Sequence, residues 1–176
     1  MKLLIASDLH GSAYYCKKLI GRFQAEGADK LILLGDLLYH GPRNPLPAEH
    51  DPKAVCAMLN PLSNRIFAVR GNCDAEVDQL VLDFPVLADY AVLFLNGKTV
   101  YLTHGHKEIP ALQKGSLLIN GHFHVPACED RGDYRYLNCG SLALPKDGTP
   151  HSYLLYDEGT FLWKDADGNE FLRETI

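Results

Sequence analysis

The stretch KLLIASDLHG, residues 2–11, contains the pattern that decides the fold. An apolar run from Lys2 to Ser7 passes directly into the polar residues of DLHG, which predicts a buried strand that enters a loop. The same pattern recurs twice. The apolar run 30–34 ends at Gly35-Asp36, and the run 65–69 ends at RGNCD, residues 70–74. We therefore expect three buried strands with polar residues at each carboxyl end.

Helix signals lie between these strands. Ser12 can cap a helix that ends near Gly27, and Asp51-Pro52 provides an N-cap followed by proline at the first position of a helix that reaches about Leu59. The order β-α-β-α-β predicts a parallel sheet that binds ligands beyond the carboxyl ends of its strands.

The second half has a different pattern. The strand-like runs 90–95 and 98–103 flank Asn96-Gly97, a strong hairpin signal, and residues 116–120 form another apolar run. Further turns at 131–132 and 157–159 separate strand-like segments. Together the two halves predict an α/β sandwich of two packed sheets in a single domain that spans residues 1–176.

Composition excludes several classes of protein. The chain has 176 residues and a net charge of −5, and its basic residues do not cluster beyond the pair Lys17-Lys18, so we expect no nucleic-acid polymer as a partner. No apolar stretch approaches about 18 residues, and the N-terminus lacks a signal-peptide pattern, so we expect no membrane association. The five cysteines form no CxxC pair, and a reducing cytoplasm is the expected setting.

Five polar clusters follow predicted strands: Asp8-Leu9-His10, Gly35-Asp36, Gly71-Asn72, Thr103-His104-Gly105-His106 and Gly121-His122-Phe123-His124. Each cluster alone is typical of an ordinary turn or loop. Together they supply carboxylates, imidazoles and one amide oxygen, which suit Mn, Fe, Zn or Co better than Ca. Seven candidate ligands are too many for one ion with room for a substrate. They suit two ions about 3.5–4 Å apart that share a carboxylate.

The ordered motifs SDLHG, GDxxxHG, RGNCD, THGH and NGHFH resemble those of the calcineurin-like metallophosphoesterase superfamily. Within the superfamily they are more closely similar to the small YfcE-like bacterial phosphodiesterases, which share HGPRN, RGNCD and NCGS-like turns. The resemblance covers Met1 to about Pro145. It implies a four-layer α/β/β/α fold, in which helices flank both packed sheets.

The resemblance also implies a ligand set. One metal ion takes Asp8, His10 and His124, the other takes Asn72, His104 and His122, and Asp36 bridges the two. Asp36, Asn72 and His104 are the residues that it assigns to catalysis. The implied cofactors are two divalent ions, Mn²⁺ foremost, with Fe, Zn, Co or Ni as alternatives. The implied reaction is in-line attack on a phosphoester by a hydroxide that bridges the metals. Because the histidines must be neutral to bind metal, affinity should fall as the pH drops.

Four residues are candidates for substrate binding: His40, Arg43, Asn44 and Cys73. His40 is equally consistent with a solvated loop residue. Arg43 and Asn44 could contact the substrate phosphate or a leaving group, and they are equally consistent with a contact between subunits of a homo-oligomer. Cys73 stands where many relatives place a histidine thought to protonate the leaving group. We expect Cys73 to be a small residue of the pocket wall, with weakly basic leaving groups preferred. His106 is expected beside His104, outside the ligand set.

These features favour a metal-dependent phosphodiesterase that acts on a small-molecule phosphodiester. A catalytically weak protein-binding scaffold of the same fold, similar to a retromer subunit, is the alternative, and the presence of all seven expected ligands argues against it. A nuclease is the third interpretation. This chain lacks the basic surface and the added capping domain that such an enzyme would need.

Overall fold

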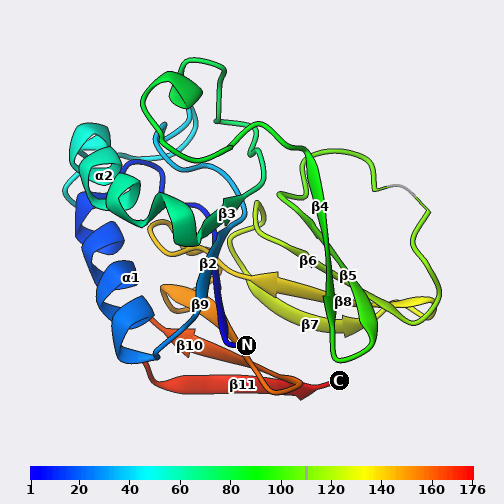
Figure 1. Ribbon diagram of the computed structural model, residues 1–176. Coiled ribbons are helices and arrows are strands. Elements are labelled where there is room, and N and C mark those ends of the chain that lie inside the picture. Colours follow the sequence, from blue (N-terminus) through cyan, green and yellow to red (C-terminus); the bar gives the residue numbers. More distant parts are fainter. Residues whose placement is uncertain (110) are drawn as a thin grey trace.

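The computed structural model describes residues 1–109 and 111–176 and contains two β-sheets that pack face to face (Figure 1). The six-stranded sheet has the order β11 (Glu170–Thr175), β10 (Thr160–Asp165), β9 (Ser152–Asp157), β1 (Leu3–Ala6), β2 (Lys30–Leu33), β3 (Ile66–Ala68). The five-stranded sheet has the order β4 (Tyr90–Leu95), β5 (Lys98–Thr103), β6 (Ser116–Asn120), β8 (Tyr134–Cys139), β7 (Pro126–Asp130). The predicted sandwich of two packed sheets is confirmed.

The N-terminal third forms the expected β-α-β-α-β unit. Helix α1 covers Ala13–Ala25, and the Ser12 hydroxyl accepts a hydrogen bond from the backbone N–H of Tyr15 at 3.2 Å. Helix α2 covers Pro52–Leu59 and is capped by the Asp51 carboxylate. Two short 3₁₀ helices follow, η1 (Asn60–Arg65) and η2 (Asp78–Leu80). Strands β1, β2 and β3 pair in parallel, so their carboxyl ends meet at one edge.

Two hydrophobic cores explain why strand β1 is apolar at every position. Leu4 and Ala6 belong to the core between the six-stranded sheet and helices α1 and α2. Leu3 and Ile5 belong to the core between the two sheets, which also contains the fully buried Trp163. Successive side chains of a strand point to opposite faces, so a strand covered on both faces shows no polar alternation.

The expected fourth layer is not observed. Both α-helices lie on the six-stranded sheet (Figure 1), and no helix covers the outer face of the five-stranded sheet in the described residues. The order of layers there is α/β/β. The hairpins β4–β5 and β7–β8 need only tight turns, and the parallel connection from β5 to β6 contains no helix in its described residues, 104–109 and 111–115.

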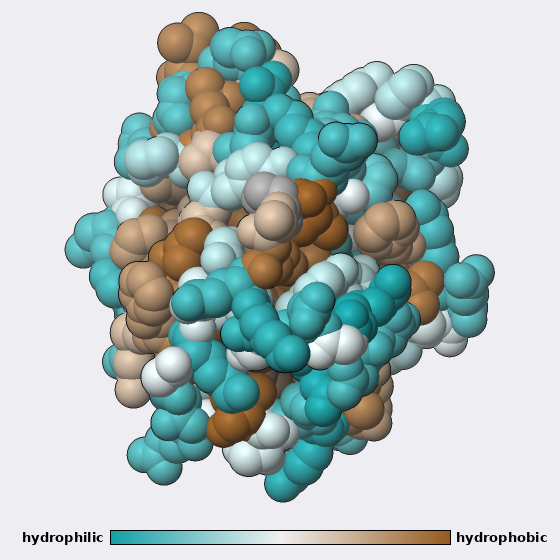
Figure 2. All heavy atoms as spheres, turned by 90° about the vertical axis from the view of Figure 1, so that its right-hand side faces the viewer, coloured by the Kyte–Doolittle hydropathy of each residue, from teal (hydrophilic) through white to brown (hydrophobic). Residues whose placement is uncertain are grey.

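Apolar side chains remain exposed on this side of the molecule. On β4 the exposed fractions are 40% for Tyr90, 46% for Val92 and 78% for Phe94. Figure 2 faces this side and shows apolar patches among hydrophilic side chains. Within the described part of the chain, no helix combines the length and apolar character that a membrane crossing needs.

The loops that follow the strands are joined by backbone hydrogen bonds. The N–H of His10 donates to the carbonyl of Asp36 at 2.9 Å, and the N–H of Gly121 donates to the carbonyl of His104 at 3.1 Å. The N–H of Leu142 donates to the carbonyl of Ser7, which connects the segment after β8 to the first loop. Loops from both sheets therefore form one rim, and the predicted site lies on it.

Candidate metal centre

Asp8, His10 and His124 bring their ligand atoms together at this rim. The Oδ1 atom of Asp8 lies 3.1 Å from Nε2 of His124 and 3.5 Å from Nε2 of His10. The two Nε2 atoms are 3.4 Å apart. Asp8 and His10 follow β1 of one sheet, and His124 follows β6 of the other. This is the first of the two ligand groups predicted from the sequence.

Asn72, His104 and His122 form the second group. Nε2 of His104 lies 3.1 Å from Oδ1 of Asn72 and 3.2 Å from Nδ1 of His122. His104 is buried, whereas Asn72 is exposed and His122 half-buried. The second group therefore faces solvent more than the first.

Asp36 lies between the two groups. Its Oδ2 atom is 3.8 Å from Nε2 of His10 and 3.4 Å from Nε2 of His104. Its other oxygen, Oδ1, accepts a hydrogen bond from the backbone N–H of Cys73 at 2.8 Å. One oxygen of Asp36 is thus fixed by the backbone, and the other faces both groups.

Backbone carbonyls determine which nitrogen of three histidines faces the site. Nδ1 of His10 lies 2.9 Å from the carbonyl oxygen of Tyr39. Nδ1 of His104 lies 2.6 Å from the carbonyl oxygen of Leu34, and Nδ1 of His124 lies 2.5 Å from the carbonyl oxygen of Leu144. A carbonyl oxygen can only accept, so each Nδ1 carries a proton, and in the neutral imidazole each Nε2 presents its lone pair to the site.

The buried Asp8 oxygen Oδ1 has no hydrogen-bond donor among the described residues. It faces the Nε2 lone pairs of His10 and His124, so several electron-rich atoms point at one another. Buried polar atoms are normally satisfied, and carbonyl-anchored imidazoles are typical of metal ligands. The donor set at this rim therefore fits a divalent cation. The role of each of the seven residues as a ligand stays a prediction.

Electrostatics agree with a site for cations. Burial raises the pKa of Asp8, but His10 and His124 more than offset this, and the net pKa lies well below the ordinary value. Burial lowers the pKa of His104, but Asp36 and Asp8 outweigh it and raise the pKa to about 9. The raised pKa of His104 reflects the two nearby carboxylates, and the lowered pKa of Asp8 reflects the imidazoles around it.

Five of the seven predicted ligands have a left-handed backbone. They are Asp8 (φ 60°), His10 (φ 48°), Asp36 (φ 56°), His122 (φ 67°) and His124 (φ 63°). This conformation is uncommon for residues with a Cβ and is unfavourable by roughly 1–2 kcal/mol per residue. Such residues cluster at functional sites, where the surrounding structure enforces them. The hydrogen bonds between the loops provide that enforcement here.

Close backbone packing also shapes the site. A Cβ atom on Gly121 would overlap Oγ of Ser7 and would lie 2.7 Å from Oδ2 of Asp8. The same Asp8 oxygen accepts a hydrogen bond from the N–H of His122 at 3.0 Å. Glycine at position 121 is therefore required for the strand β6 loop to approach the strand β1 loop.

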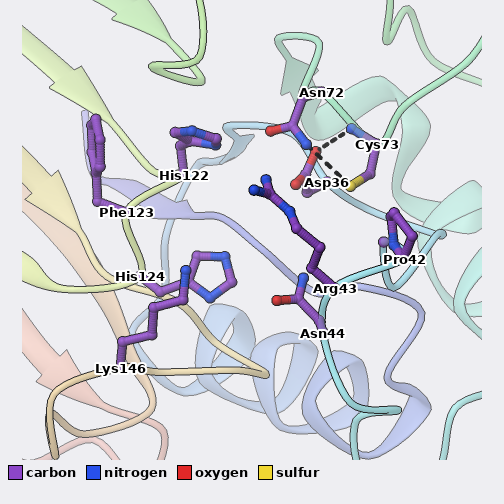
Figure 3. Close-up of a pocket in the computed structure, with 11 residues that line it drawn as sticks. Asp36, Pro42, Arg43, Asn44, Asn72, Cys73, His122, Phe123, His124 and Lys146 are labelled. Atoms are coloured by element: carbon purple, nitrogen blue, oxygen red, sulfur yellow. Dashed lines mark hydrogen bonds between the residues drawn. The ribbon is translucent and has the colours of Figure 1, made fainter.

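A pocket of about 410 Å³ opens beside the two groups (Figure 3). Its lining residues are Asp36, Gly41, Pro42, Arg43, Asn44, Asn72, Cys73, His122, Phe123, His124 and Lys146. Three of the four predicted substrate-binding residues, Arg43, Asn44 and Cys73, are among them. In Figure 3 the guanidinium group of Arg43 extends toward the space between His122 and Asp36.

His40, the fourth candidate, does not line this pocket. Its ring packs between the rings of Tyr39 and His50, with centroid distances of 4.9 Å and 5.3 Å. Its backbone carbonyl instead accepts a hydrogen bond from the Asn44 side chain at 2.8 Å, which holds the loop that carries Arg43. His106 lies beside the second group, with its ring centroid 5.4 Å from that of His104.

Cys73 is part of the pocket wall. A Cβ on Gly41 would lie 3.2 Å from its sulfur, so the HGPRN loop packs directly against the thiol. Asn72 Nδ2 donates to this sulfur at 3.3 Å. Burial, followed by the nearby Asp36 carboxylate, raises the pKa of the Cys73 thiol to about 12.

Phe123 and Lys146 are among the lining residues for which the sequence predicts no function. Phe123 lies between two candidate ligands in NGHFH, which is a local signal that could have identified it. Lys146 follows β8 in the chain without any motif, and only the fold brings it to the pocket.

The fold and the site together define a metal-dependent phosphoesterase. Residues 1–160 match the family model of the calcineurin-like phosphoesterase superfamily domain, and the chain belongs to this superfamily. It is 44% identical over 161 residues to the phosphodiesterase YfcE of Escherichia coli K12, a match that covers 89% of this chain and 88% of that protein.

Solved structures agree with this assignment. The structure of the E. coli phosphoesterase YfcE superimposes with a TM-score of 0.95 at 40% identity over the whole of both chains. The structure of Vps29 from Entamoeba histolytica in complex with Zn²⁺ has a TM-score of 0.65 at 20% identity and covers 99% of both chains. The second likeness shows the fold alone.

Proposed function

We propose that this chain is a dinuclear metal-dependent phosphodiesterase that acts on a small-molecule phosphodiester, with residues 1–176 as a single metallophosphoesterase domain. Asp8, His10 and His124 would hold one divalent ion, and Asn72, His104 and His122 the other. Asp36 would bridge them. Mn²⁺ is the proposed metal, with Fe, Zn, Co or Ni as alternatives.

One observation supports this proposal above the others. The Oδ2 atom of Asp36 is within 4 Å of Nε2 of both His10 and His104, which belong to different ligand groups. A carboxylate oxygen placed between two sets of lone pairs suits two cations better than one. In this role the two cations would satisfy Oδ2 of Asp36 in place of a hydrogen-bond donor. The other oxygen, Oδ1, already accepts a hydrogen bond from the Cys73 N–H.

When bound, two such cations supply an activated water for attack on phosphorus and neutralise charge on the phosphate oxygens. The residues of the chain position the substrate. Arg43 can pair with a phosphate oxygen, since a guanidinium matches phosphate geometry. Asn72 contributes a neutral oxygen, so the site keeps less negative charge than a third carboxylate would give it, and an anionic substrate is repelled less.

The leaving group receives no proton from an imidazole at position 73, because a thiol stands there. We infer that weakly basic leaving groups, such as phenols, depart readily and that simple alkoxides do not. This preference favours activated or aromatic diesters over alkyl monoesters as substrates.

The test uses the purified protein and bis(4-nitrophenyl) phosphate. We expect hydrolysis with added Mn²⁺, its loss in chelator and its return with metal. Metal analysis should find two ions per chain. Asp36→Asn should lose both ions and lower kcat by about 100-fold or more. Asp133→Asn, an exposed carboxylate in the β7–β8 turn, is the matched control and should behave as the wild type.

The alternative function, a protein-binding scaffold of the same fold, makes a different prediction. Such a protein would bind metal but show no metal-dependent turnover of any diester in a panel of cyclic nucleotides, dinucleotides and headgroup diesters. Full turnover in the presence of chelator would contradict the two-metal proposal directly.

A further inference from the structure

Phe123 is an exposed aromatic ring at the metal centre. Its exposed fraction is 52%, and it belongs to neither hydrophobic core. It lines the pocket between the candidate ligands His122 and His124, and in Figure 3 its ring stands beside His122 at the pocket edge.

The backbone that carries this ring is constrained on both sides. His122 and His124 are both left-handed, and the N–H of Phe123 donates to the carbonyl of Gly121 at 2.7 Å. The ring meets that of His122 edge to face, with centroids 5.1 Å apart and an interplanar angle of 72°. A ring on a constrained backbone that also contacts His122 loses less freedom when a partner stacks on it than a ring on a free loop would.

Phe123 also lines two hollows. One is the 410 Å³ pocket at the metal centre. The other has a volume of about 260 Å³, and Val125, Ala127, Glu129, Arg131 and Tyr136 line it together with Phe123. A substituent of the phosphate that is larger than methyl can therefore continue over the ring, away from the reacting centre.

Lys146 supplies a positive charge on the same side of the pocket. Its backbone N–H donates to the carbonyl of His124 at 3.1 Å, and His124 contacts the carbonyl of Leu144, so this segment is attached to the ligand loop. Lys146 forms no ion pair with a carboxylate in the described residues. Figure 3 shows Lys146 and Phe123 on one side of the pocket and Asn44 and Cys73 on the other.

We propose that Phe123 and Lys146 form a subsite for the ester group that stays on phosphorus, and that this group is nucleotide-like. A flat heterocycle stacks on Phe123, and a second anionic group pairs with Lys146. This inference rests on the proposed phosphodiesterase function and specifies its substrate class. An aromatic ring can stack on any nucleobase, so Phe123 would not distinguish between bases. Lys146 would favour a substrate that carries a second negative charge.

Three substrates with one leaving group test the proposal. They are methyl 4-nitrophenyl phosphate, thymidine 5′-(4-nitrophenyl phosphate) and the same nucleoside diester with a 3′-phosphate. Each releases 4-nitrophenolate, so the bond that breaks is the same and differences in kcat/KM report the group that remains. The variants are Phe123→Leu and Lys146→Gln. The matched controls are Phe94→Leu and Lys114→Gln, which are exposed and lie outside the pocket.

We expect the wild type to prefer the thymidine diester over the methyl diester, and Phe123→Leu to reduce this preference by about 5-fold or more, the lower end for base stacking. Lys146→Gln should reduce the added preference for the 3′-phosphate by about 5-fold, mainly through KM, and added salt should weaken the wild-type preference likewise.

Two results would overturn the inference. One is an equal preference among the three substrates in the wild type. The other is a Phe123→Leu variant that loses as much activity on the methyl diester as on the thymidine diester, which would place the leaving group on the ring. Metal-dependent turnover of the methyl diester by the wild type shows in either case that the proposed function still holds.

Discussion

The buried carboxylate of Asp74 accepts a hydrogen bond from the backbone N–H of Asp36 at 2.7 Å. It also accepts from the N–H groups of Gly71 at 2.7 Å and Leu37 at 2.9 Å. The last residue of RGNCD thus joins the loop after β2, which carries the proposed bridging ligand, to the loop after β3, which carries Asn72. Asp74 is a positioning residue, and it holds two halves of the centre in register.

Asp74→Asn should therefore loosen the centre. An asparagine side chain has one acceptor and one donor group, so at least one buried N–H would face another donor, at a penalty of about 1–3 kcal/mol. We expect a lower melting temperature and weaker Mn²⁺ binding, measured by thermal unfolding and metal titration. Asp133→Asn serves again as control. Unchanged stability with unchanged metal affinity would contradict the proposed role.

Cys73→His should widen the range of leaving groups. A positioned imidazole can donate a proton to a basic leaving group, and general acid catalysis contributes about 100-fold or more when geometry is good. We expect the rate for a phenyl diester relative to its 4-nitrophenyl counterpart to rise by about 10-fold. Cys73→Ala removes the sulfur without adding an acid, and it should leave that ratio as in the wild type. A rise with alanine as well would show that space, not acidity, limits the reaction.

Gly121→Ala should distort the metal centre, since its Cβ would overlap Ser7 and crowd Asp8. Overpacking of this kind is unfavourable by about 1–3 kcal/mol. Gly21 provides a control of opposite sign. It lies on the exposed side of helix α1 with open space around its Cα, and Gly21→Ala should stabilise the fold by roughly 0.5–1 kcal/mol. Chemical denaturation of both variants measures the difference.

Glu26 should make the stability depend on pH. Its Oε1 accepts from Lys164 Nζ at 2.6 Å and from the Tyr153 hydroxyl at 2.8 Å. Burial raises the pKa of Glu26, but Lys164 and Tyr153 outweigh this and lower it below the ordinary 4.5. A carboxyl with a depressed folded-state pKa stabilises the fold above its unfolded pKa, and this contribution is lost as the pH falls through the folded value.

Glu26→Gln keeps the shape and removes the charge. We expect a loss of roughly 0.5–1 kcal/mol at pH 7, a modest value because solvent screens the pair, and a difference from the wild type that shrinks below about pH 4.5. Urea unfolding between pH 3 and 7 tests this. Glu158→Gln, an exposed turn residue, should show no such trend. A difference that persists at pH 3 would assign the effect to packing.

Features set by local chemistry were predictable from the sequence. Ser12 and Asp51 begin their helices as expected, and Asn96 and Gly97 have the positive φ values that a tight hairpin turn requires. The candidate ligands converge because each follows a strand, and strands that run in the same direction end at the same edge.

Features set by distant contacts were not predictable. Strands β9, β10 and β11 return to the first sheet, where β9 pairs antiparallel with β1, and no local pattern in residues 152–175 distinguishes that sheet from the other. The parallel connection from β5 to β6 would usually contain a helix, but none is present in its described residues, so the strand pattern alone predicts a layer that is not observed. Lys146 reaches the pocket only because its N–H meets the carbonyl of His124.

The left-handed conformation of five candidate ligands sets activity against stability. Each of these residues has a strained backbone conformation that glycine would adopt without strain. Replacement by glycine would therefore relieve the strain and at the same time remove a candidate ligand atom. In the metal-free chain, replacement of such a residue by glycine is therefore expected to lower the backbone strain of the folded state while it weakens the candidate metal site.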